Sequence, residues 1–230
     1  AARSRHDVLA MAALGAGAVA KLFPAASAPI VALRSAEPLR TAALFVAVVA
    51  LFYLPTAVLP FSSAAGIGFY AVGIPSNLDS VWGIAERLLL VFGVPGAGTV
   101  VLAVTIVGLT ITYVARAVPA GLRAMDPAVG LAMATLALLF WSRLYSPQYS
   151  LWVLPFFALL GLRARTYLLL TAADVGVFLT IYPLTLVQRD ATDVQGALLL
   201  GGLGAAVVLR HVALVKMWRE LSSRAREQAA

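Results

Sequence analysis

The sequence predicts an all-α protein, specifically a polytopic helical membrane protein with short or re-entrant helices. Two observations support this fold class. Hydrophobic residues make up 62% of the chain and charged residues only 12%, with a mean hydropathy of +0.94, a balance that a soluble domain of this size does not normally show. The apolar runs are also continuous and rich in leucine, alanine and valine, whereas strands of a membrane β-barrel alternate apolar and polar residues.

The distribution of cations predicts the topology. The net charge is +7, but the cations lie in short segments between apolar runs rather than on one basic face, so nucleic acid is not expected as a partner. Most of them, with Arg210 included, fall on one predicted membrane face, which the positive-inside rule makes cytoplasmic. Arginine is far commoner than lysine and alanine is abundant, a habit of GC-rich bacterial genomes. The predicted location is the bacterial plasma membrane, crossed several times.

The first apolar segment, residues 8–33, holds Lys21, Pro24 and Pro29 in its middle. One interpretation is a re-entrant hairpin with its tip at Lys21, and the other is a complete span; the arginine count favours the hairpin. A charged side chain at membrane depth costs about 2.5 to 3.5 kcal/mol. Lys21 is therefore expected to face a cavity, to form a structural ion pair, or to extend toward the membrane surface.

The remaining apolar runs predict several spans and one interfacial helix. Asp79 and Ser80 are expected to cap the interfacial helix at residues 81–92, which is too short to cross a bilayer. A short basic loop is expected at 116–126, and the predicted domains are a transmembrane part at 1–215 and a basic cytoplasmic tail at 216–230. The expected spans are residues 41–59, 99–115, 166–187 and 194–215.

The segment 143–155 is the most informative in the chain, because it places a cation, hydroxyls, an amide and two prolines between two apolar runs. Both runs, 128–141 and 151–162, are shorter than the roughly 20 residues that a spanning helix needs. We expect a polar elbow at or slightly below the non-cytoplasmic face, where a cavity would satisfy its backbone amides.

The polar residues expected at this face suit a phosphate and a hydroxyl-rich ligand. Cations and amide donors bind phosphate, and tyrosine or glutamine binds sugar hydroxyls. Arg189 is expected on the same face. The predicted substrate-binding residues are Lys21, Asp79, Arg143, Tyr145, Ser146, Gln148 and Tyr149.

Other polar residues receive plainer interpretations. His6 and His211 are expected at cytoplasmic helix ends as ordinary interfacial residues. No helix carries histidine and carboxylate pairs at ligand spacing, so no metal site is expected. Asp174 lies inside a predicted span; it either serves as an ion or proton site or pairs with an arginine, a tyrosine or the backbone across a helix interface.

Three short segments together resemble one known family. Residues 15–24, Gly-Ala-Gly-Ala-Val-Ala-Lys-Leu-Phe-Pro, resemble the Gly-Leu-Ala-Ala…Lys-Leu-Tyr-Pro segment of bacterial polyprenol-phosphate-mannose-dependent mannosyltransferases, which are C-type membrane glycosyltransferases. Residues 78–82, Leu-Asp-Ser-Val-Trp, resemble their outer-loop Ile-Glu-Ser-Val-Trp pattern. Residues 146–155, Ser-Pro-Gln-Tyr-Ser-Leu-Trp-Val-Leu-Pro, are similar to their Ser-Pro-Gln-Tyr-Leu-Leu-Trp-Leu-Leu-Pro segment. The order and spacing of the three segments carry the resemblance.

The resemblance implies an inverting transferase that takes a hexose, usually mannose, from polyprenyl phosphate on the non-cytoplasmic face, without a cofactor. In such enzymes a carboxylate in the first outer loop is the general base, and cations hold the leaving lipid phosphate. That loop belongs to the N-terminal half of the family and has no counterpart here, so no catalytic residue is assigned. The chain is expected to be the C-terminal part of a larger enzyme and inactive alone. Phe23 and Asp79 replace a tyrosine and a glutamate of the family.

The expected partners are a polyprenyl-phosphate-linked sugar donor, a lipid or glycan acceptor, and membrane lipids. Two other classes stay open. One is a transporter or flippase for lipids or ions, in which Asp174 and Lys21 are intramembrane charges. The other is a non-catalytic scaffold subunit of a membrane complex.

Overall fold

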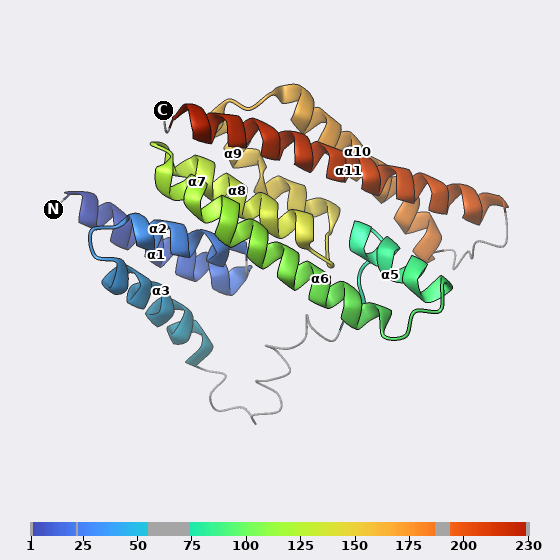
Figure 1. Ribbon diagram of the computed structural model, residues 1–230, viewed down its shortest axis with the longest axis horizontal. Coiled ribbons are helices and arrows are strands. Elements are labelled where there is room, and N and C mark those ends of the chain that lie inside the picture. The colour runs from blue at the N-terminus through green and yellow to red at the C-terminus, as the bar shows by residue number, and fades with distance from the viewer. Residues whose placement is uncertain (1, 22, 55–73, 187–193, 229–230) are drawn as a thin grey trace. The chain divides into compact units, whose positions relative to one another are not determined.

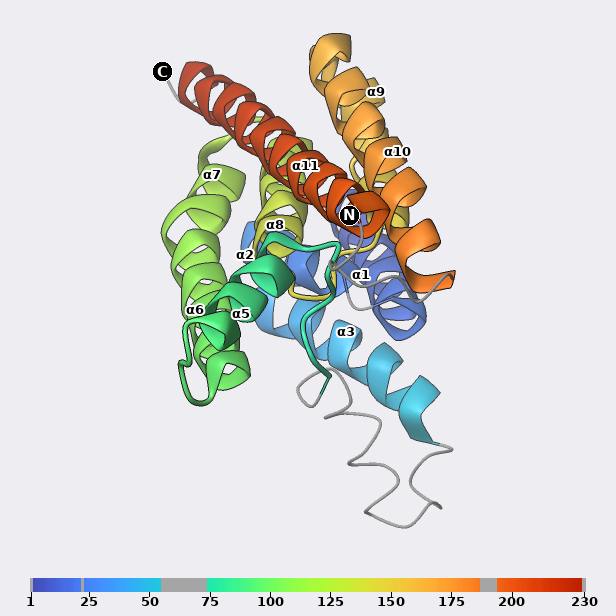
Figure 2. The same ribbon diagram turned by 90° about the vertical axis from the view of Figure 1, so that its right-hand side faces the viewer.

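The computed structural model describes residues 2–21, 23–54, 74–186 and 194–228, and within these ranges the regular structure is entirely helical. The prediction of an all-α fold is therefore confirmed for the part of the chain that the structure describes. The chain divides into two compact units, which we describe separately (Figures 1 and 2). The first unit contains residues 1–74, 113–138 and 225–230, and the second contains 75–112 and 139–224.

The first unit is built on a broken helix and the helix that follows it. α1 (Ala2–Ala20) ends beside Lys21, and the chain turns through the short 3-10 helix η1 (Phe23–Ser27) into α2 (Ala28–Arg34). The break coincides with the expected hairpin tip, since Pro24 lies within η1 and Pro29 stands at the start of α2. α2 contacts α1 again, and α3 (Pro38–Tyr53) packs on both (Figure 1).

The second half of the first unit contains a helix that the sequence did not predict. The expected loop at 116–126 is wrong: a five-residue π turn, η3 (Tyr113–Ala117), leads into α7 (Val118–Arg123). The π turn takes up an extra residue, and Pro119 stands in the first turn of α7, where its missing N–H is not needed. Only a short turn then separates α7 from α8 (Pro127–Trp141), whose first turn is capped by the Asp126 carboxylate.

Arg34 and two glycines bind α2, α7 and α8 together within the first unit. The Arg34 guanidinium donates from Nη1 to the carbonyls of Gly121 at 2.6 Å and Ala124 at 2.7 Å, which would otherwise be free at the end of α7. Gly121 and Gly130 let α7 and α8 cross with their backbones in contact, because a Cβ added at Gly130 would lie 2.1 Å from the Gly121 Cα.

The second unit contains two long helices and several short ones. α5 begins after Ser80, whose hydroxyl accepts the Gly83 N–H at 2.8 Å, so the predicted N-cap at Ser80 is confirmed. The elbow is a loop followed by a short 3-10 helix rather than wholly irregular chain. The elements of the unit are α5 (Val81–Val91), α6 (Ala97–Thr112), η4 (Pro147–Trp152), α9 (Leu154–Leu160), α10 (Ala164–Leu186) and α11 (Val194–Glu227).

α10 and α11 lie side by side and form the core of the second unit (Figures 1 and 2). Val177 and Val207 are completely buried between them. Small residues let the helices approach, since a Cβ at Gly176 would lie 3.1 Å from Ala206 and one at Gly202 would lie 3.1 Å from Thr180. α11 continues through Lys216 to Glu227 without a break, so residues 216–227 of the predicted basic tail are helical and extend the last span.

Three described helices are long and apolar enough to cross a membrane: residues Ala97–Arg123, Ala164–Thr185 and Val194–Glu227. α3 and α8 are apolar but shorter, which agrees with the expectation of short helices. The expected span at 41–59 continues into residues 55–59, which lie outside the described ranges, as does the loop with Arg189.

We expect Gly130→Ala to destabilise the first unit, because the added methyl meets the backbone of Gly121 and neither helix can move without disturbing the other. Overpacking of this kind costs about 1 to 3 kcal/mol. The control is Gly201→Ala on α11, where a Cβ meets nothing within 4 Å. Thermal unfolding of both variants in detergent measures the difference. A Gly130→Ala protein as stable as the Gly201→Ala protein would contradict the close crossing.

Candidate functional site

The most unusual feature of the second unit is a completely buried arginine. The Arg210 side chain, from the middle of α11, is 0% exposed. Its Nη1 donates to Asp174 Oδ1 on α10 at 3.3 Å, and its Nη2 donates to the backbone carbonyl of Asp79. The guanidinium carbon lies 3.9 Å from the centre of the Tyr145 ring. A buried charge is tolerated only with such partners, because removing it from water is expensive.

Tyr145 links this arginine to the elbow. Its ring is 0% exposed, and its hydroxyl shares a 2.9 Å hydrogen bond with Ser150 Oγ in η4. Ser150 in turn lies beside the Asp174 carboxylate. A cation over a buried aromatic ring contributes about 2 kcal/mol or more once water is excluded. Arginine, tyrosine, serine and aspartate therefore form a continuous polar chain inside an apolar unit.

The elbow is also bound to the segment before α5. The Arg143 backbone carbonyl accepts the Asn77 N–H at 2.9 Å and faces Ser80 Oγ at 3.0 Å. The Ser80 hydroxyl has one proton, which the Arg143 and Asn77 carbonyls share; the Asn77 oxygen lies 2.8 Å from Ser80 Oγ. Ser80 Oγ also accepts the Gly83 N–H and so caps α5. Glycine is required at position 83, because a Cβ there would lie 1.8 Å from the Asn77 oxygen.

Stacked aromatic rings continue this contact along α5 and α8. Trp82 and Trp141 stack with ring centres 4.9 Å apart and planes 18° from parallel. The Trp82 indole N–H donates to the Phe140 carbonyl at 2.8 Å, and the Trp141 indole N–H donates to Thr112 Oγ1 at 3.0 Å. Both half-buried indole donors are thus satisfied, and the end of α8 is held against α5 just where the elbow begins.

Asp79 does not cap α5, contrary to prediction. Ser80 performs that role, and the Asp79 side chain turns into the buried cluster, where its Oδ1 has no hydrogen-bond partner. Burial raises the pKa of the Asp79 carboxyl above its usual range, and the Arg210 guanidinium opposes this rise. Burial likewise raises the pKa of the Tyr145 phenol. Both groups therefore take up protons more readily than they do in water.

The elbow packs against the middle of α10. Asp174 stands near the middle of α10, which runs from Ala164 to Leu186, so Tyr145 and Ser150 contact the middle of a helix long enough to cross a membrane. The position of the elbow at or slightly below one membrane face stays a prediction. The helices on both sides of the elbow, α8 and α9, are short, as the sequence predicted.

The structure brings together four of the predicted site residues. Asp79, Arg143 and Tyr145 are buried, and Tyr149 stacks on Trp152 with ring centres 4.2 Å apart. Ser146 is half-buried and Gln148 is exposed on the outside of the elbow.

Lys21 belongs to the first unit, where its side chain is exposed. Its placement beside the other site residues stays a prediction.

Two assignments from the sequence are wrong, and both concern α11. Arg210 was counted among the cytoplasmic cations, and His211 was placed at a helix end. Both side chains instead lie inside the protein: Arg210 is completely buried, and His211 is 9% exposed, with Nδ1 3.0 Å from the Val207 carbonyl. The alternative that paired Asp174 with an arginine is confirmed.

A signal for Arg210 existed in the sequence. Asp174 and Arg210 are opposite charges in two consecutive apolar runs, and a charge within a span needs a partner. Ser150, which was not predicted, carries no comparable signal because a lone serine is common in any loop.

The cluster has the chemistry of an ion-pair network rather than of a metal site. Across the described ranges, no group of three or more histidine, cysteine, aspartate or glutamate side chains could hold a metal ion. Asp174 lies against a guanidinium, which occupies the place that a metal cation would take. The network can position the elbow, and its second carboxylate, Asp79, can hold or release a proton.

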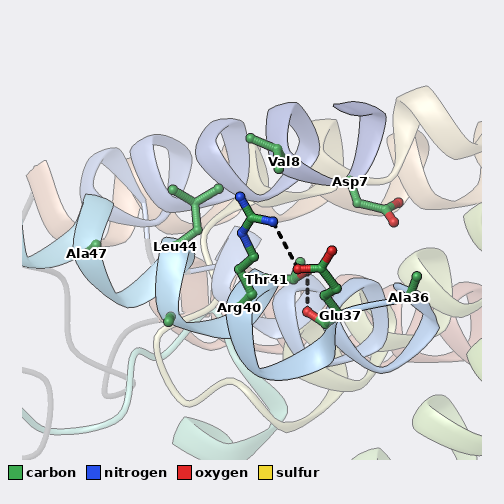
Figure 3. Close-up of a pocket in the computed structure, with 9 residues that line it drawn as sticks. Asp7, Val8, Ala36, Glu37, Arg40, Thr41, Leu44 and Ala47 are labelled. Atoms are coloured by element: carbon green, nitrogen blue, oxygen red, sulfur yellow. Dashed lines mark hydrogen bonds and ion pairs between the residues drawn. The ribbon is translucent and has the colours of Figure 1, made fainter. Parts of the chain in front are cut away.

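A separate cavity of about 500 Å³ lies in the first unit between α1 and α3 (Figure 3). Its polar wall is an exposed ion pair, Arg40 Nη1 to Glu37 Oε2 at 3.0 Å, with side chains 76% and 54% exposed. Thr41 donates to the Glu37 carbonyl at 2.8 Å, so this end of the cavity is a solvated helix start. It provides a natural control for the buried pair.

We expect Arg210→Leu to destabilise the protein by about 3 to 5 kcal/mol, because it leaves the Asp174 carboxylate buried without its partner. Adding Asp174→Leu should recover part of the loss. Removing the exposed pair, by Glu37→Ala and Arg40→Ala, should change stability by no more than about 1 kcal/mol. Equilibrium unfolding in detergent measures each variant. Equal, additive effects at both pairs would show that Arg210 and Asp174 do not interact.

The pH dependence of stability should report Asp79. An acid with a raised pKa in the folded state stabilises the fold below its unfolded pKa of about 3.9, and this contribution is lost as pH rises through the folded pKa. The melting temperature of the wild type should therefore fall from pH 4 toward neutrality more steeply than that of Asp79→Asn. Arg210, Asp174 and Tyr145 face this carboxyl and are retained in both proteins. Parallel curves for the two proteins would contradict the burial of Asp79.

Comparison of the chain with family models, with curated proteins and with solved structures finds no match.

Proposed function

We propose that this chain is the C-terminal membrane part of a glycosyltransferase that takes a hexose, with mannose as the first candidate, from polyprenyl phosphate. The single observation that supports the proposal most is the meeting of two segments that carry the family resemblance. Residues 78–82 and 146–155 are far apart in sequence, yet they meet at one arginine: Asp79 of the first segment accepts from Arg210, and Ser150 of the second bonds Tyr145, whose ring lies under the same guanidinium. Motifs that serve one site must meet in space, whereas unrelated chance matches need not.

The exposed side of the elbow carries the groups that suit a sugar. Gln148 offers an amide that can donate to and accept from hydroxyls. The stacked Tyr149 and Trp152 add an aromatic surface, of the kind that lines small-molecule sites beside a few polar groups. In this proposal Arg143 of the second unit contacts the donor phosphate through the small part of it that stays exposed, and Ser146 shapes the pocket. The role of Lys21, which belongs to the first unit, stays a prediction.

The buried residues receive a positioning role within the same proposal. Tyr145 is 0% exposed and lies under Arg210, and the Asp79 carbonyl accepts from the same guanidinium, so both residues face the arginine rather than a ligand. They hold the elbow and the segment before α5 in one geometry, as supporting residues do around many sites. The general base for the acceptor hydroxyl would come from the N-terminal half of the enzyme, and the acceptor is a lipid or glycan on the non-cytoplasmic face of the bacterial plasma membrane.

A transporter or flippase is the second candidate, and a specific observation favours it. Asp174 and Arg210 lie near the middle of α10 and α11, beside the elbow that separates the short helices α8 and α9. Asp79 Oδ1, in the same cluster, has no hydrogen-bond partner among the described residues. Transporters use discontinuous helices and intramembrane carboxylates at such depth. Movement of a lipid or ion by the protein in liposomes, without any sugar donor, would support this candidate.

In the full-length enzyme, Arg143→Ala and Gln148→Ala should each lower sugar transfer from polyprenyl-phosphate-linked mannose by about tenfold or more, because each removes a direct contact to the donor. Expression in the membrane should stay unchanged. Arg87→Ala, which removes an exposed cation of α5 in the same unit, is the matched control and should transfer normally. Normal turnover in both elbow variants would rule out the proposed site.

A further inference from the structure

Four cations surround a cavity of about 460 Å³ between the start of α10 and the C-terminal part of α11. Arg163 and Arg165 stand at the start of α10, and Lys216 and Arg219 stand on the neighbouring face of α11. Within the described residues, none of these four side chains has a hydrogen bond or an ion pair. Four cations around one cavity, without a described acidic side chain paired to any of them, favour an anionic ligand.

The one carboxylate of this cavity is already engaged. Glu220 Oε1 accepts the backbone N–H of Arg163 at 3.1 Å and lies 3.5 Å from Arg224 Nη2. Arg224 also donates to the carbonyls of Leu160 and Gly161, which end α9. Glu220 and Arg224 therefore neutralise each other and bind the backbone between α9 and α10. No acidic side chain among the described residues of the cavity compensates the positive charge of the other four residues.

An apolar groove continues from the basic cavity along α11. This second cavity of about 550 Å³ is bordered by α5, α8 and α11, and Lys216 and Arg219 line both cavities. Val208, Val212 and Val215 line the groove at helical spacing, so they share one face of α11 with the two cations. Val208 is 56% exposed and Val212 is 42% exposed, so this part of the groove is open to a ligand.

We propose that this combined surface binds one anionic phospholipid, with its phosphate among the four cations and an acyl chain in the groove. The cations lie where the candidate span of α10 begins, at Ala164, and this is the level of the headgroups if α10 crosses. Basic pockets between helices attract anionic headgroups on the cytoplasmic side, and the arginine count predicts this end of the protein to be cytoplasmic. The site is independent of the proposed transferase function.

Native mass spectrometry of the purified protein in detergent tests the site, with dioleoyl-phosphatidylglycerol and dioleoyl-phosphatidylcholine as probes. The anionic lipid should bind about tenfold tighter or more. Soluble glycerol phosphate, which has the same phosphate but no chains, should bind at least tenfold more weakly than the anionic lipid. Equal binding of the two lipids would overturn the role of the cations. Equal binding of glycerol phosphate and the anionic lipid would overturn the role of the groove.

Variants separate the two parts of the site. Arg165→Gln with Arg219→Gln should weaken phosphatidylglycerol binding about tenfold, whereas Arg123→Gln with Arg226→Gln, an equal loss of exposed charge outside the cavity, should leave it unchanged. Val212→Gln should weaken the lipid and not glycerol phosphate. If the double cavity variant does not fold, Arg165→Gln alone should show a smaller loss at an unchanged melting temperature. Wild-type lipid binding by the folded cavity variants would overturn the proposal.

Discussion

The buried guanidinium of Arg210 is the interaction on which the second unit depends. A charge without water must be surrounded by acceptors, and its partners come from three separate places: the Asp174 carboxylate on α10, the Asp79 carbonyl before α5 and the Tyr145 ring in the elbow. None of these partners can move far without leaving the charge uncompensated. A single side chain of α11 thereby fixes the position of a loop and an elbow that lack long helices of their own.

α11 serves two kinds of chemistry along its length. In its middle, Arg210 supports the elbow, whose exposed side presents Gln148 and the Tyr149–Trp152 stack. Toward its C-terminal end, Lys216 and Arg219 belong to an open cavity where no acidic side chain within the described ranges forms a salt bridge with them. A basic side chain of α11 therefore has a structural role where it is buried and paired, as Arg210 is. It is available for a ligand where it is exposed near the end of the helix, as Lys216 and Arg219 are.

Much of the fold could be predicted because apolar runs and their breaks are local features. The elbow between α8 and α9, the break at Lys21 and the Ser80 cap all follow from neighbouring prolines, glycines and hydroxyls. The helix at 118–123 was missed because Arg116 and Pro119 suggested a loop. The π turn η3 instead leads directly into α7, and the backbone stays helical through both residues.

The site was harder to predict than the helices. Its central pair joins residues 36 positions apart, and a sequence does not show which charges meet in space. Arg210 looked like an ordinary end-of-span cation, since an arginine within a few turns of a basic segment usually extends toward the membrane surface. The Asp79 carboxylate and the Ser80 hydroxyl are adjacent, and either can cap a helix. Ser80 is the cap because the buried Arg210 binds the Asp79 carbonyl and draws that residue into the cluster.

The most direct test of the account is hydrogen exchange at the elbow in an Arg210→Lys protein. Lysine keeps the positive charge opposite Asp174 but lacks the planar fork that reaches the Asp79 carbonyl and covers Tyr145. If Arg210 fixes the elbow, the amides of Asn77 and of residues 146–153 should exchange faster than in the wild type, while those of α1 and α3 in the first unit stay unchanged. Unchanged protection at the elbow would show that its geometry does not depend on this arginine.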